Sequence, residues 1–372
     1  MFFSSLRTAS FRNLADTEIS TNAKDVFLVG ENGQGKTNFL EALYFCAYAS
    51  SFRAVHDAEL ARNGEKDFSA EVKLSDSVND QILVKSENGK KTVFINGKKA
   101  DDRKELLSIA PSIVFCHEDM EFVSGNHERR RWFFDQTLSL YDPVYLEDLR
   151  RFRRVLKSRN TVLRDYAQKK QQSESAISVL DALDPQFAEY GLKLMEKRET
   201  AAKDFSVIFS TLYEEVSGIC GITVRYIPSW KSDAPFSHLQ ERRSAEMSAG
   251  LSLSGPHRDR YQFTHNGEDF TIKASTGQRR LLALLLRTAQ ALRYSQETRL
   301  NPILLLDDVL LEMDGEKRRK FLSALPSYDQ AFYTFLPEEP YQRYKKEDTI
   351  IYNVIKGKLV ASTGSATAVT GN

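Results

Sequence analysis

Residues 26–40 read VFLVGENGQGKTNFL: an apolar run, a glycine-rich turn and the start of a helical pattern. A short apolar run that ends in a glycine turn predicts a buried strand at Val26–Val29. From Lys36 to Ala49 the apolar residues recur at helical spacing, which predicts a helix. The turn between them, Gly30–Thr37, matches G-x-x-x-x-G-K-[ST] in the strand-to-helix setting that this motif requires. The stretch therefore predicts an α/β protein with a phosphate-binding loop.

The phosphate-binding loop predicts a site for a nucleoside triphosphate, which we expect to be ATP. Its glycines let backbone N–H groups turn toward phosphate oxygens, and the positive end of the following helix favours an anion there. We expect Lys36 to reach the β- and γ-phosphates and Thr37 to ligate Mg²⁺. The alternative is a plain glycine-rich turn. The expected nucleotide contacts of the loop are Gly30, Glu31, Asn32, Gly33, Gln34, Gly35, Lys36 and Thr37.

A second acidic element completes the predicted ATPase site. The apolar run Ile303–Leu306 is followed by Asp307 and Asp308, the pattern of a buried strand that ends in carboxylates. We expect Asp307 to hold Mg²⁺, usually through water, and Asp308 to orient or deprotonate the attacking water. The alternative for Asp308 is a helix N-cap, because the chain becomes helical again near Asp314.

A long charged segment separates the two halves of the site. From Arg129 to Gly218 the pattern is helical, with helices expected at Val144–Lys170 and Pro185–Val216 and the polar stretch Gln168–Ser178 between them. This predicts an antiparallel helical arm. Pro228–Gly250 is expected to be a loop returning to the core. Alternating segments between Phe68 and Lys98, with Asn-Gly turns, predict a small antiparallel sheet.

The split site is typical of the ATPase heads of the SMC, Rad50 and ABC class. That class has a signature loop that opens a helix, and Ala274–Gln278 resembles it. In such proteins the signature serine, here Ser275, contacts the γ-phosphate bound by a second subunit. Taken alone, this segment favours an ordinary helix N-cap, and only its register with the other two motifs favours the signature.

The expected fold is therefore an ABC/SMC-type P-loop ATPase head of the α/β class, with a mixed sheet, a small antiparallel β-subdomain and an inserted antiparallel helical arm. Four parts are expected along the chain. They are residues 1–125 and 251–360 as the two parts of the head, 126–250 as the arm with its return loop, and 361–372 as a disordered tail.

Composition limits the environment and the chemistry. With 41% hydrophobic and 28% charged residues the chain fits a globular protein, and its formal net charge of +1 gives no global field for nucleic acid. The three cysteines have no metal-ligand spacing, and no 18-residue apolar run occurs. We expect a cytoplasmic protein without a membrane partner, and neither a zinc site nor a nucleophilic hydrolase triad.

A local basic stretch is the candidate for DNA contact. Nine basic residues and one acidic residue lie between Arg150 and Lys170. On a helix they would form a broad face able to neutralise phosphates, with Arg150, Arg151, Arg154 and Lys157 as the expected contacts. A solvated helix surface or a patch that recruits a protein is the alternative. His257 is expected to have a structural role in its turn rather than one at a dimer or DNA surface, and the role of His117 stays open.

The residues around these motifs resemble the RecF family of bacterial recombination and gap-repair ATPases. The resemblance spans residue 10 to about 335, and G-P-H-R-D with L-L-D-D-V is quite specific to the family. The matching segments are Ser10–Asn13, Asn38–Tyr44, Ser51–Arg53, Phe115–Asp119, Arg129–Arg131 with Phe134–Asp135, Tyr145–Leu146, Ser158–Asn160, Gly255–Asp259, and Leu305–Val309 with Glu312–Asp314.

The resemblance implies a DNA-binding ATPase that forms a homodimer when ATP binds and separates after slow, DNA-stimulated hydrolysis. It implies work with RecR and RecO, which load RecA at single-strand gaps or duplex junctions, and a part in replication and the SOS response. It also places Arg12 and Asn13 at the nucleotide. The alternatives are another SMC- or Rad50-like head protein, an ABC transporter subunit, or a DNA-binding scaffold with little hydrolysis.

Three segments depart from the family pattern. Cys116-His117 replaces the family's proline, which puts the contact of that loop with Mg²⁺ or water in doubt. The signature ends in Gln278-Arg279-Arg280, which adds positive charge at the expected dimer face. The second threonine expected next to Thr334 is missing, so we expect control of hydrolysis to differ and nucleotide binding to be unaffected.

Overall fold

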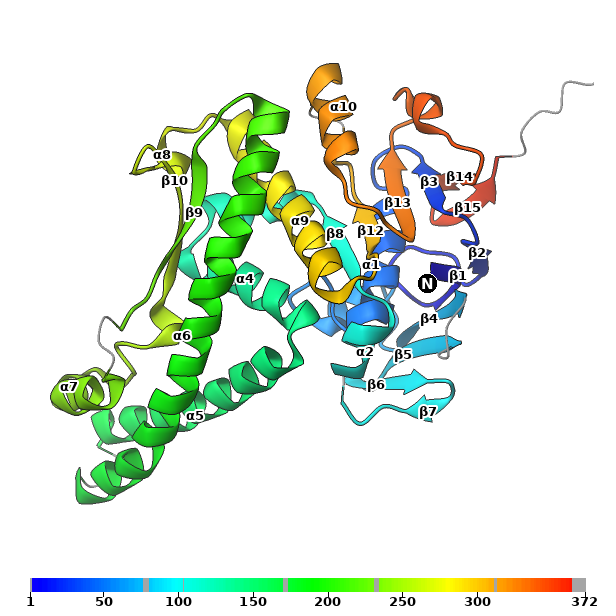
Figure 1. Cartoon of the computed structure of the whole chain (residues 1–372). Coiled ribbons are helices and arrows are strands. Elements are labelled where there is room, and N and C mark those ends of the chain that lie inside the picture. The colour runs from blue at the N-terminus through cyan, green and yellow to red at the C-terminus, as the bar shows by residue number, and fades with distance from the viewer. Residues whose placement is uncertain are drawn as a thin grey trace, which may run out of the picture. The chain divides into compact units, whose positions relative to one another are not determined.

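The computed structural model describes residues 2–75, 80–102, 104–169, 173–230, 234–310 and 313–362 (Figure 1). By compactness the chain divides into two units, Met1–Asp119 with Arg299–Asn372, and Met120–Thr298. The four-part division predicted above groups Ser275 with Asp307 and stays a prediction. Most of the expected tail, residues 363–372, and Glu312 of the family segment lie outside the described residues.

The first unit is built on a mixed sheet in the order β15-β14-β3-β13-β12-β8. Neighbouring strands are parallel except for the antiparallel pair β14 and β15. The predicted strands at Val26–Val29 and Ile303–Leu306 are confirmed, and both are buried along their whole length. Continuous apolar runs of this kind fit a sheet that is covered on both faces. The strands are β3 (Asp25–Val29), β8 (Ser112–Phe115), β12 (Ile303–Leu306), β13 (Gln330–Phe335), β14 (Thr349–Ile355) and β15 (Lys358–Ala361).

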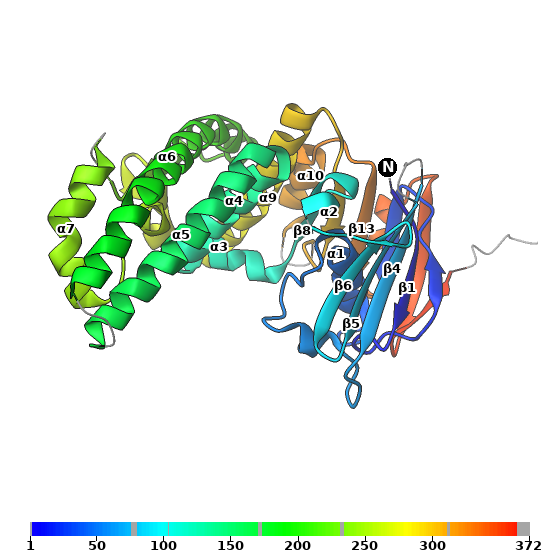
Figure 2. The ribbon, with the colours of Figure 1, turned by 90° about the horizontal axis from the view of Figure 1, so that it is seen from below.

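A second, antiparallel sheet of the first unit confirms the small sheet predicted from Phe68 to Lys98. Its order is β2-β1-β4-β5-β6-β7 (Figure 2). Buried and less buried residues alternate along β4, as in a sheet with one face on the core. Positive φ at Asn88-Gly89 and Asn96-Gly97 fits the tight hairpin turns predicted there. The strands are β1 (Phe2–Ala9), β2 (Glu18–Ser20), β4 (Phe68–Ser75), β5 (Gln81–Glu87), β6 (Lys90–Ile95) and β7 (Lys98–Lys99).

Helix α1 (Lys36–Tyr48) follows the phosphate-binding loop and contacts strands of both sheets. Phe39, Leu40 and Leu43 join one apolar cluster with residues of β3 and β13. Burying an apolar side chain of this size contributes roughly 1.5–3 kcal/mol, so this cluster anchors the start of the helix at the site. The unit also contains α2 (Lys104–Ile109), α10 (Gly315–Ala324) and the 3₁₀ turns η1 (Asp57–Leu60), η2 (His117–Asp119) and η4 (Tyr341–Tyr344).

The second unit contains the predicted helical arm. Helices α5 (Pro143–Ala167) and α6 (Ser173–Ser217) run side by side (Figure 1). Phe152 of α5 stacks on Phe187 of α6 with ring centroids 4.9 Å apart, within the contact layer of the two helices. The other helices are α3 (Met120–Ser124), α4 (His127–Tyr141), α7 (Pro235–Ala249), α8 (Phe270–Lys273) and α9 (Thr276–Thr298). The 3₁₀ turn η3 (Pro256–Arg258) and a sheet of β9 (Ile222–Ile227), β10 (Arg260–His265) and β11 (Glu268–Asp269) complete the unit.

Two sequence expectations about the arm are wrong. Helix α6 begins at Ser173, so Pro185 lies inside it and not at its start. Proline is costly in a helix interior, but Leu180, Asp184 and Phe187 around it are fully buried, and this packing outweighs the local preference. The expected joining stretch Gln168–Ser178 is correspondingly shorter.

The expected return loop Pro228–Gly250 contains a helix of 15 residues, α7. Pro235 stands at its first turn, and Gly250 ends it with φ of 69°, both ordinary helix-boundary positions. The helix was missed because few of its residues are apolar; its buried side includes Leu239, Met247 and the acidic Glu246. No described helix combines the length and the apolar composition that crossing a bilayer requires.

Candidate functional site

The predicted phosphate-binding loop lies between the end of β3 and the start of α1. Gly35 has φ of 114°, a conformation that other residues rarely adopt. A Cβ on Gly30 would lie 2.5 Å from the carbonyl oxygen of Val354 in β14, so only glycine fits there. A cavity of about 160 Å³ opens at the loop, and its lining combines six residues of the loop with Asn38, Arg53 and one of the two aspartates. The lining residues are Glu31, Asn32, Gly33, Gly35, Lys36, Thr37, Asn38, Arg53 and Asp308.

Lys36 is held at this loop by backbone carbonyls. Its Nζ donates hydrogen bonds to the carbonyl oxygen of Gly30 and, over 3.4 Å, to that of Glu31. The side chain is only 4% exposed. The charged end of Lys36 is therefore already at the loop whose N–H groups point at an anion.

Asn13 and the β14–β15 hairpin fix the shape of the loop. Nδ2 of Asn13 donates to the carbonyl oxygen of Gly33 over 3.1 Å. From the hairpin, the backbone N–H of Gly357 donates to the carbonyl oxygen of Gln34 over 2.8 Å, and that of Lys356 to its Oε1 over 2.7 Å. No sequence motif marks Lys356 and Gly357, so these contacts of the hairpin with the loop could not be predicted from the sequence.

Arg12 contacts helix α1, which follows the loop. Its guanidinium donates two hydrogen bonds, of 3.0 and 3.1 Å, to the carboxylate of Glu41 in α1. Glu41 is fully buried and also accepts from Arg53 over 2.8 Å and from Ser51 over 2.6 Å. Burial raises the pKa of Glu41, but the hydrogen bonds from Arg53 and Arg12 outweigh it, so the pKa is lowered overall. Glu41 thus stays ionised and holds two arginines beside the loop.

Arg53 is a site residue that the sequence reasoning did not single out. It lines the loop cavity, and its guanidinium also donates to Oδ1 of Asn38. Burial lowers the pKa of Arg53, but the hydrogen bond to Glu41 and the charges of Glu41, Asp307 and Glu118 outweigh it, so the pKa is raised overall. The segment Ser51–Arg53, noted only as a landmark of resemblance, was the available signal.

The acidic half of the site meets the loop as predicted. Oγ1 of Thr37 donates a 2.9 Å hydrogen bond to Oδ1 of Asp307, which follows β12 directly. Asp308 has φ of 50°, and its backbone N–H donates to Oγ1 of Thr334 over 2.7 Å. The Thr334 hydroxyl lies within hydrogen-bond distance of both carboxylates, 3.2 Å from Asp307 and 2.8 Å from Asp308. Thr334 therefore couples the two aspartates through one hydroxyl.

The alternative that Asp308 caps the next helix is wrong. The N-cap of α10 is Asp314, whose carboxylate accepts from the backbone N–H of Lys317 over 2.9 Å. Asp308 instead points to the loop cavity that it lines.

Burial raises the pKa of Asp307 to about 7, and the charge of Asp308 adds to this, while hydrogen bonds from Thr37 and Thr334 act in the opposite direction. A cation bound at Asp307 would favour the ionised form of that carboxyl group. The oxygen ligands present, a threonine hydroxyl and carboxylates, are those Mg²⁺ prefers. No cluster of three or more His, Cys, Asp or Glu side chains suited to a metal occurs among the described residues. The set fits Mg²⁺ that takes its other ligands from phosphate and water.

Ser275 is the N-terminal cap of α9. Its Oγ accepts from the backbone N–H of Gln278 over 3.2 Å, and its own N–H donates to Oε1 of Gln278 over 2.8 Å. The hydrogen bonds of Ser275 are thus those of a helix N-cap, as the alternative interpretation of this segment expects. Ser275 is also exposed, as a contact to a second subunit requires.

The basic stretch of α5 is less uniform than predicted. Arg159 is fully buried, and its guanidinium bonds Asp184 over 2.8 Å and Glu246 over 2.6 Å, so it is unable to contact DNA. Arg151 and Arg154 are exposed and lie 3.1 and 3.6 Å from Glu147. Lys157 is exposed, whereas Arg150 is half-buried. Lys170 lies outside the described residues.

The histidines differ in environment. Nε2 of His257 lies 3.1 Å from the carbonyl oxygen of Ser252, within the turn that precedes β10, which fits the expected structural role. Burial lowers the pKa of His257 to about 4, and the charges of Arg258, Arg131 and Arg159 act in the same direction. His117 is exposed in η2.

Comparisons with known proteins agree with this geometry. The family model described as the RecF/RecN/SMC N terminal domain matches residues 2–353. The DNA replication and repair protein RecF of Treponema pallidum (strain Nichols) is 43% identical over 356 residues, which cover 94% of this chain and 98% of the relative. The chain belongs to the RecF family. The RecF protein of Staphylococcus aureus (strain bovine RF122 / ET3-1) is 30% identical, with 97% of this chain and all of the relative covered.

Solved structures support the RecF family assignment. A structure described as the recombination mediator protein RecF-ATP in the RecFOR pathway is 25% identical and has a TM-score of 0.85 over 97% of this chain and 98% of that one. An SMC head bound to the C-winged helix domain of ScpA, at 16% identity, 98% coverage of each chain and a TM-score of 0.56, shares the fold. The ATPase-head fold and the RecF-family role in DNA replication and repair are confirmed, over the alternative of another SMC- or Rad50-like head protein.

Proposed function

We propose that this RecF-family protein binds ATP at Gly30–Thr37 and uses it to join two copies of the chain around DNA. The observation that carries the proposal is the contact of Thr37 with Asp307, since it unites the phosphate-binding loop with the acidic strand end. The similar structure described as RecF-ATP supports ATP as the nucleotide.

The residues of the site divide the work on the nucleotide. The loop N–H groups and Lys36 hold the phosphates, and Thr37 and Asp307 hold Mg²⁺, which when bound neutralises phosphate charge. Asp308 orients or deprotonates the attacking water. The hydroxyl of Thr334, 2.8 Å from Asp308, fixes the direction of that carboxylate. Asn13 keeps the loop in shape, and Arg12 with Arg53 supplies positive charge behind it.

A second copy completes the site through its Ser275. The exposed N-terminus of α9 offers N–H groups to an anion, as the first site does with its own helix. Binding of ATP then joins two subunits, and slow hydrolysis separates them. An aspartate at position 308 is one methylene shorter than a glutamate, which favours slow turnover.

Exposed basic residues of α5 contact DNA in this proposal, namely Arg151, Arg154 and Lys157, with Arg150 at their edge. Their charge neutralises phosphates without reading sequence. The similar structure described within the RecFOR pathway supports RecO and RecR as partners. Loading of RecA at single-strand gaps is the purpose that we propose. A place in the cytoplasm stays a prediction.

Binding of a fluorescent ATP analogue to the full chain tests the nucleotide site. Lys36→Ala removes the charge expected to bind the β- and γ-phosphates, and we expect affinity to fall at least 100-fold while the melting temperature changes little. Lys24→Ala, at the other end of β3, is the matched control and should bind as the parent does. Equal affinity of the Lys36→Ala and parent proteins would show that the nucleotide binds elsewhere.

A further inference from the structure

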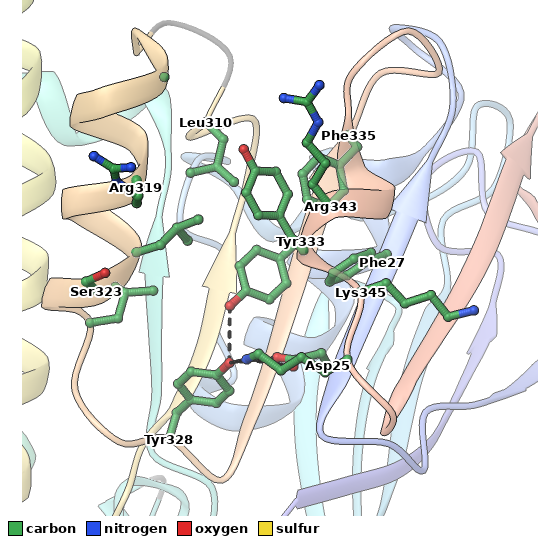
Figure 3. A pocket seen from close by; sticks show the side chains of 15 residues that line it. Asp25, Phe27, Leu310, Arg319, Ser323, Tyr328, Tyr333, Phe335, Arg343 and Lys345 are labelled. Carbon is green, nitrogen blue, oxygen red and sulfur yellow. Dashed lines mark hydrogen bonds and ion pairs between the residues drawn. The ribbon is translucent and has the colours of Figure 1, made fainter.

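A second cavity of the first unit lies away from the phosphate-binding loop. It has a volume of about 490 Å³ and is open between α10 and the segment 341–346 (Figure 3). Phe27, Tyr333 and Phe335 line it, whereas their strand neighbours Leu28 and Phe332 belong to the apolar cluster with α1. Since successive strand residues point to opposite faces, the cavity lies on the sheet face opposite α1.

The floor of the cavity is aromatic and already packed. The ring of Phe27 meets those of Tyr333 and Phe335 edge-on, with centroids 5.3 and 5.0 Å apart. The ring of Phe335 also stacks on Tyr344 at 6.2 Å. The aromatic rings thus hold one another in a fixed arrangement and are almost fully buried. The apolar surface that stays accessible in the cavity comes from the half-buried lining residues Leu322, Leu325 and Tyr344.

The rim of the cavity carries cations without partners. Arg319 extends from α10, and Arg343 and Lys345 extend from the other side (Figure 3). All three are exposed, and within the described part of the chain their side chains form no hydrogen bond or ion pair. The rim therefore offers positive charge on both sides of an apolar floor.

Among the described residues that line the cavity, Asp25 is the single acid, and its charge is compensated. It is 1% exposed, its Oδ1 accepts from the hydroxyl of Tyr328 over 2.8 Å, and Nζ of Lys346 lies 3.1 Å from its Oδ2. Lys346 also donates to the Tyr328 hydroxyl over 2.8 Å. Asp25 thus does not cancel the charge of the rim.

We propose that this cavity binds an acidic peptide segment of a partner protein, with one apolar side chain inserted between α10 and the segment 341–346. A cavity of this volume takes a ligand with one large anchor, and apolar floors with few polar groups are the usual form of such sites. Acidic residues on either side of the anchor would meet Arg319 on one side and Arg343 with Lys345 on the other. The cations of the rim thus favour peptides with acidic residues beside the anchor, and the apolar lining favours a large apolar side chain as the anchor itself.

Nucleic acid fits the cavity less well. Single-stranded binding uses open ring faces for stacking and a continuous basic track for the backbone. Here Phe27 and Phe335 are at most 1% exposed, and the ring of Phe335 is stacked on Tyr344. The three cations stand on two sides of a pocket, which suits a short acidic segment.

The site has a direct structural link to the acidic strand end. Leu310 of its lining comes two residues after Asp308, and Tyr333 and Phe335 flank Thr334, whose hydroxyl contacts both carboxylates. A bound segment would lie against the strand that positions these groups. The binding itself stands apart from the proposed function, because none of its contacts involves the nucleotide loop.

Selection from a displayed library of random 12-residue peptides on the full chain tests the proposal. Enriched peptides should carry an aromatic or large aliphatic residue flanked by Asp or Glu, and synthetic copies should bind in fluorescence anisotropy. The double variant Arg319→Glu/Arg343→Glu should weaken them at least tenfold, and Ser323→Trp, which fills the cavity mouth, should weaken them similarly. Lys320→Glu, on α10 but outside the lining, is the matched charge control and should leave binding unchanged.

Three results would overturn the proposal. One is a selection that yields no peptide of this pattern. Another is acidic peptides that bind the double variant, or the folded Ser323→Trp protein, as well as they bind the parent. The third is an oligothymidylate that displaces the acidic peptides and binds more tightly, which would identify the surface as a nucleic-acid site. Circular dichroism and the retained affinity for an ATP analogue confirm that the variants are folded.

Discussion

Oγ1 of Thr37 donates a 2.9 Å hydrogen bond to Oδ1 of Asp307, 270 residues further along the chain. The contact brings the strand-loop-helix at the start of the chain together with the acidic end of β12. Between the two residues the chain builds strands β4 to β7 of the second sheet and the whole second unit, Met120–Thr298. One nucleotide site therefore depends on two distant segments, each of which is recognisable by its own motif.

Thr334→Val should slow ATP hydrolysis and destabilise the first unit. Valine keeps the shape but removes the oxygen that accepts from the N–H of Asp308 and contacts both carboxylates. Leaving such buried groups unpaired costs about 1–3 kcal/mol. Urea unfolding and phosphate release measure the two effects. Thr334→Ser retains the hydroxyl and should behave as the parent; a valine variant with parental turnover would remove Thr334 from the mechanism.

Arg159→Ala should be among the most destabilising changes in the second unit. The guanidinium is fully buried between Asp184 and Glu246 and also donates to Oγ of Ser252 over 2.7 Å. Removing one partner of a buried ion pair costs about 3–5 kcal/mol. Lys157→Ala, exposed on the same helix, should change the free energy of unfolding by less than about 0.5 kcal/mol. Similar urea midpoints for both variants would contradict the structural role of Arg159.

Arg154→Ala/Lys157→Ala should weaken binding of duplex DNA and make it less dependent on salt. Each phosphate contact adds about 0.9 to the slope of log affinity against log salt, so the slope should fall by roughly 2. The control is Lys193→Ala/Lys203→Ala, which removes two exposed lysines of α6 that pair with glutamates. If the salt slopes of all three proteins coincide, α5 contacts protein or solvent and not DNA.

Protonation of His257 should destabilise the protein below neutral pH. Its folded pKa of about 4 lies below the ordinary value of 6.5, chiefly because of burial. The folded state thus binds fewer protons, so the stabilisation is present above pH 6.5 and is lost as the pH falls toward 4. The slope contributed is at most about 1.4 kcal/mol per pH unit. Urea unfolding at pH 7 and pH 5 should show a smaller difference for His257→Gln than for the parent.

The motifs of the site could be predicted from sequence because each reports local chemistry. Gly30–Thr37 and Asp307-Asp308 have fixed spacing imposed by phosphate and metal binding, and the structure brings them together. The hairpin at Lys356-Gly357 has no pattern of its own, because it acts through tertiary contacts to the loop. Arg53 belongs to a segment of family resemblance, but its contacts with Glu41 and the cavity are tertiary and do not follow from that segment alone.

The arm shows where local patterns fail. Proline favours the first turn of a helix, so the sequence predicts a helix start at Pro185, but buried neighbours keep the helix continuous through it. A charged side chain such as that of Arg159 is expected to be exposed to solvent. In the structure it is buried, because it forms ion pairs with Asp184 on α6 and Glu246 on α7. Such partners lie far away in sequence, and α7 itself has too little apolar character to be found by periodicity.

The most direct test of ATP-driven pairing is the molar mass of the full chain by light scattering, with Mg²⁺ and with or without ATP. The parent should have the monomer mass alone and twice that mass with ATP. Lys36→Ala and Ser275→Arg should stay monomeric with ATP, while Ser158→Arg, the same change at an exposed serine of α5, should dimerise. A parent that remains monomeric with ATP, or a Ser275→Arg protein that dimerises as the parent does, would contradict a site completed by a second copy.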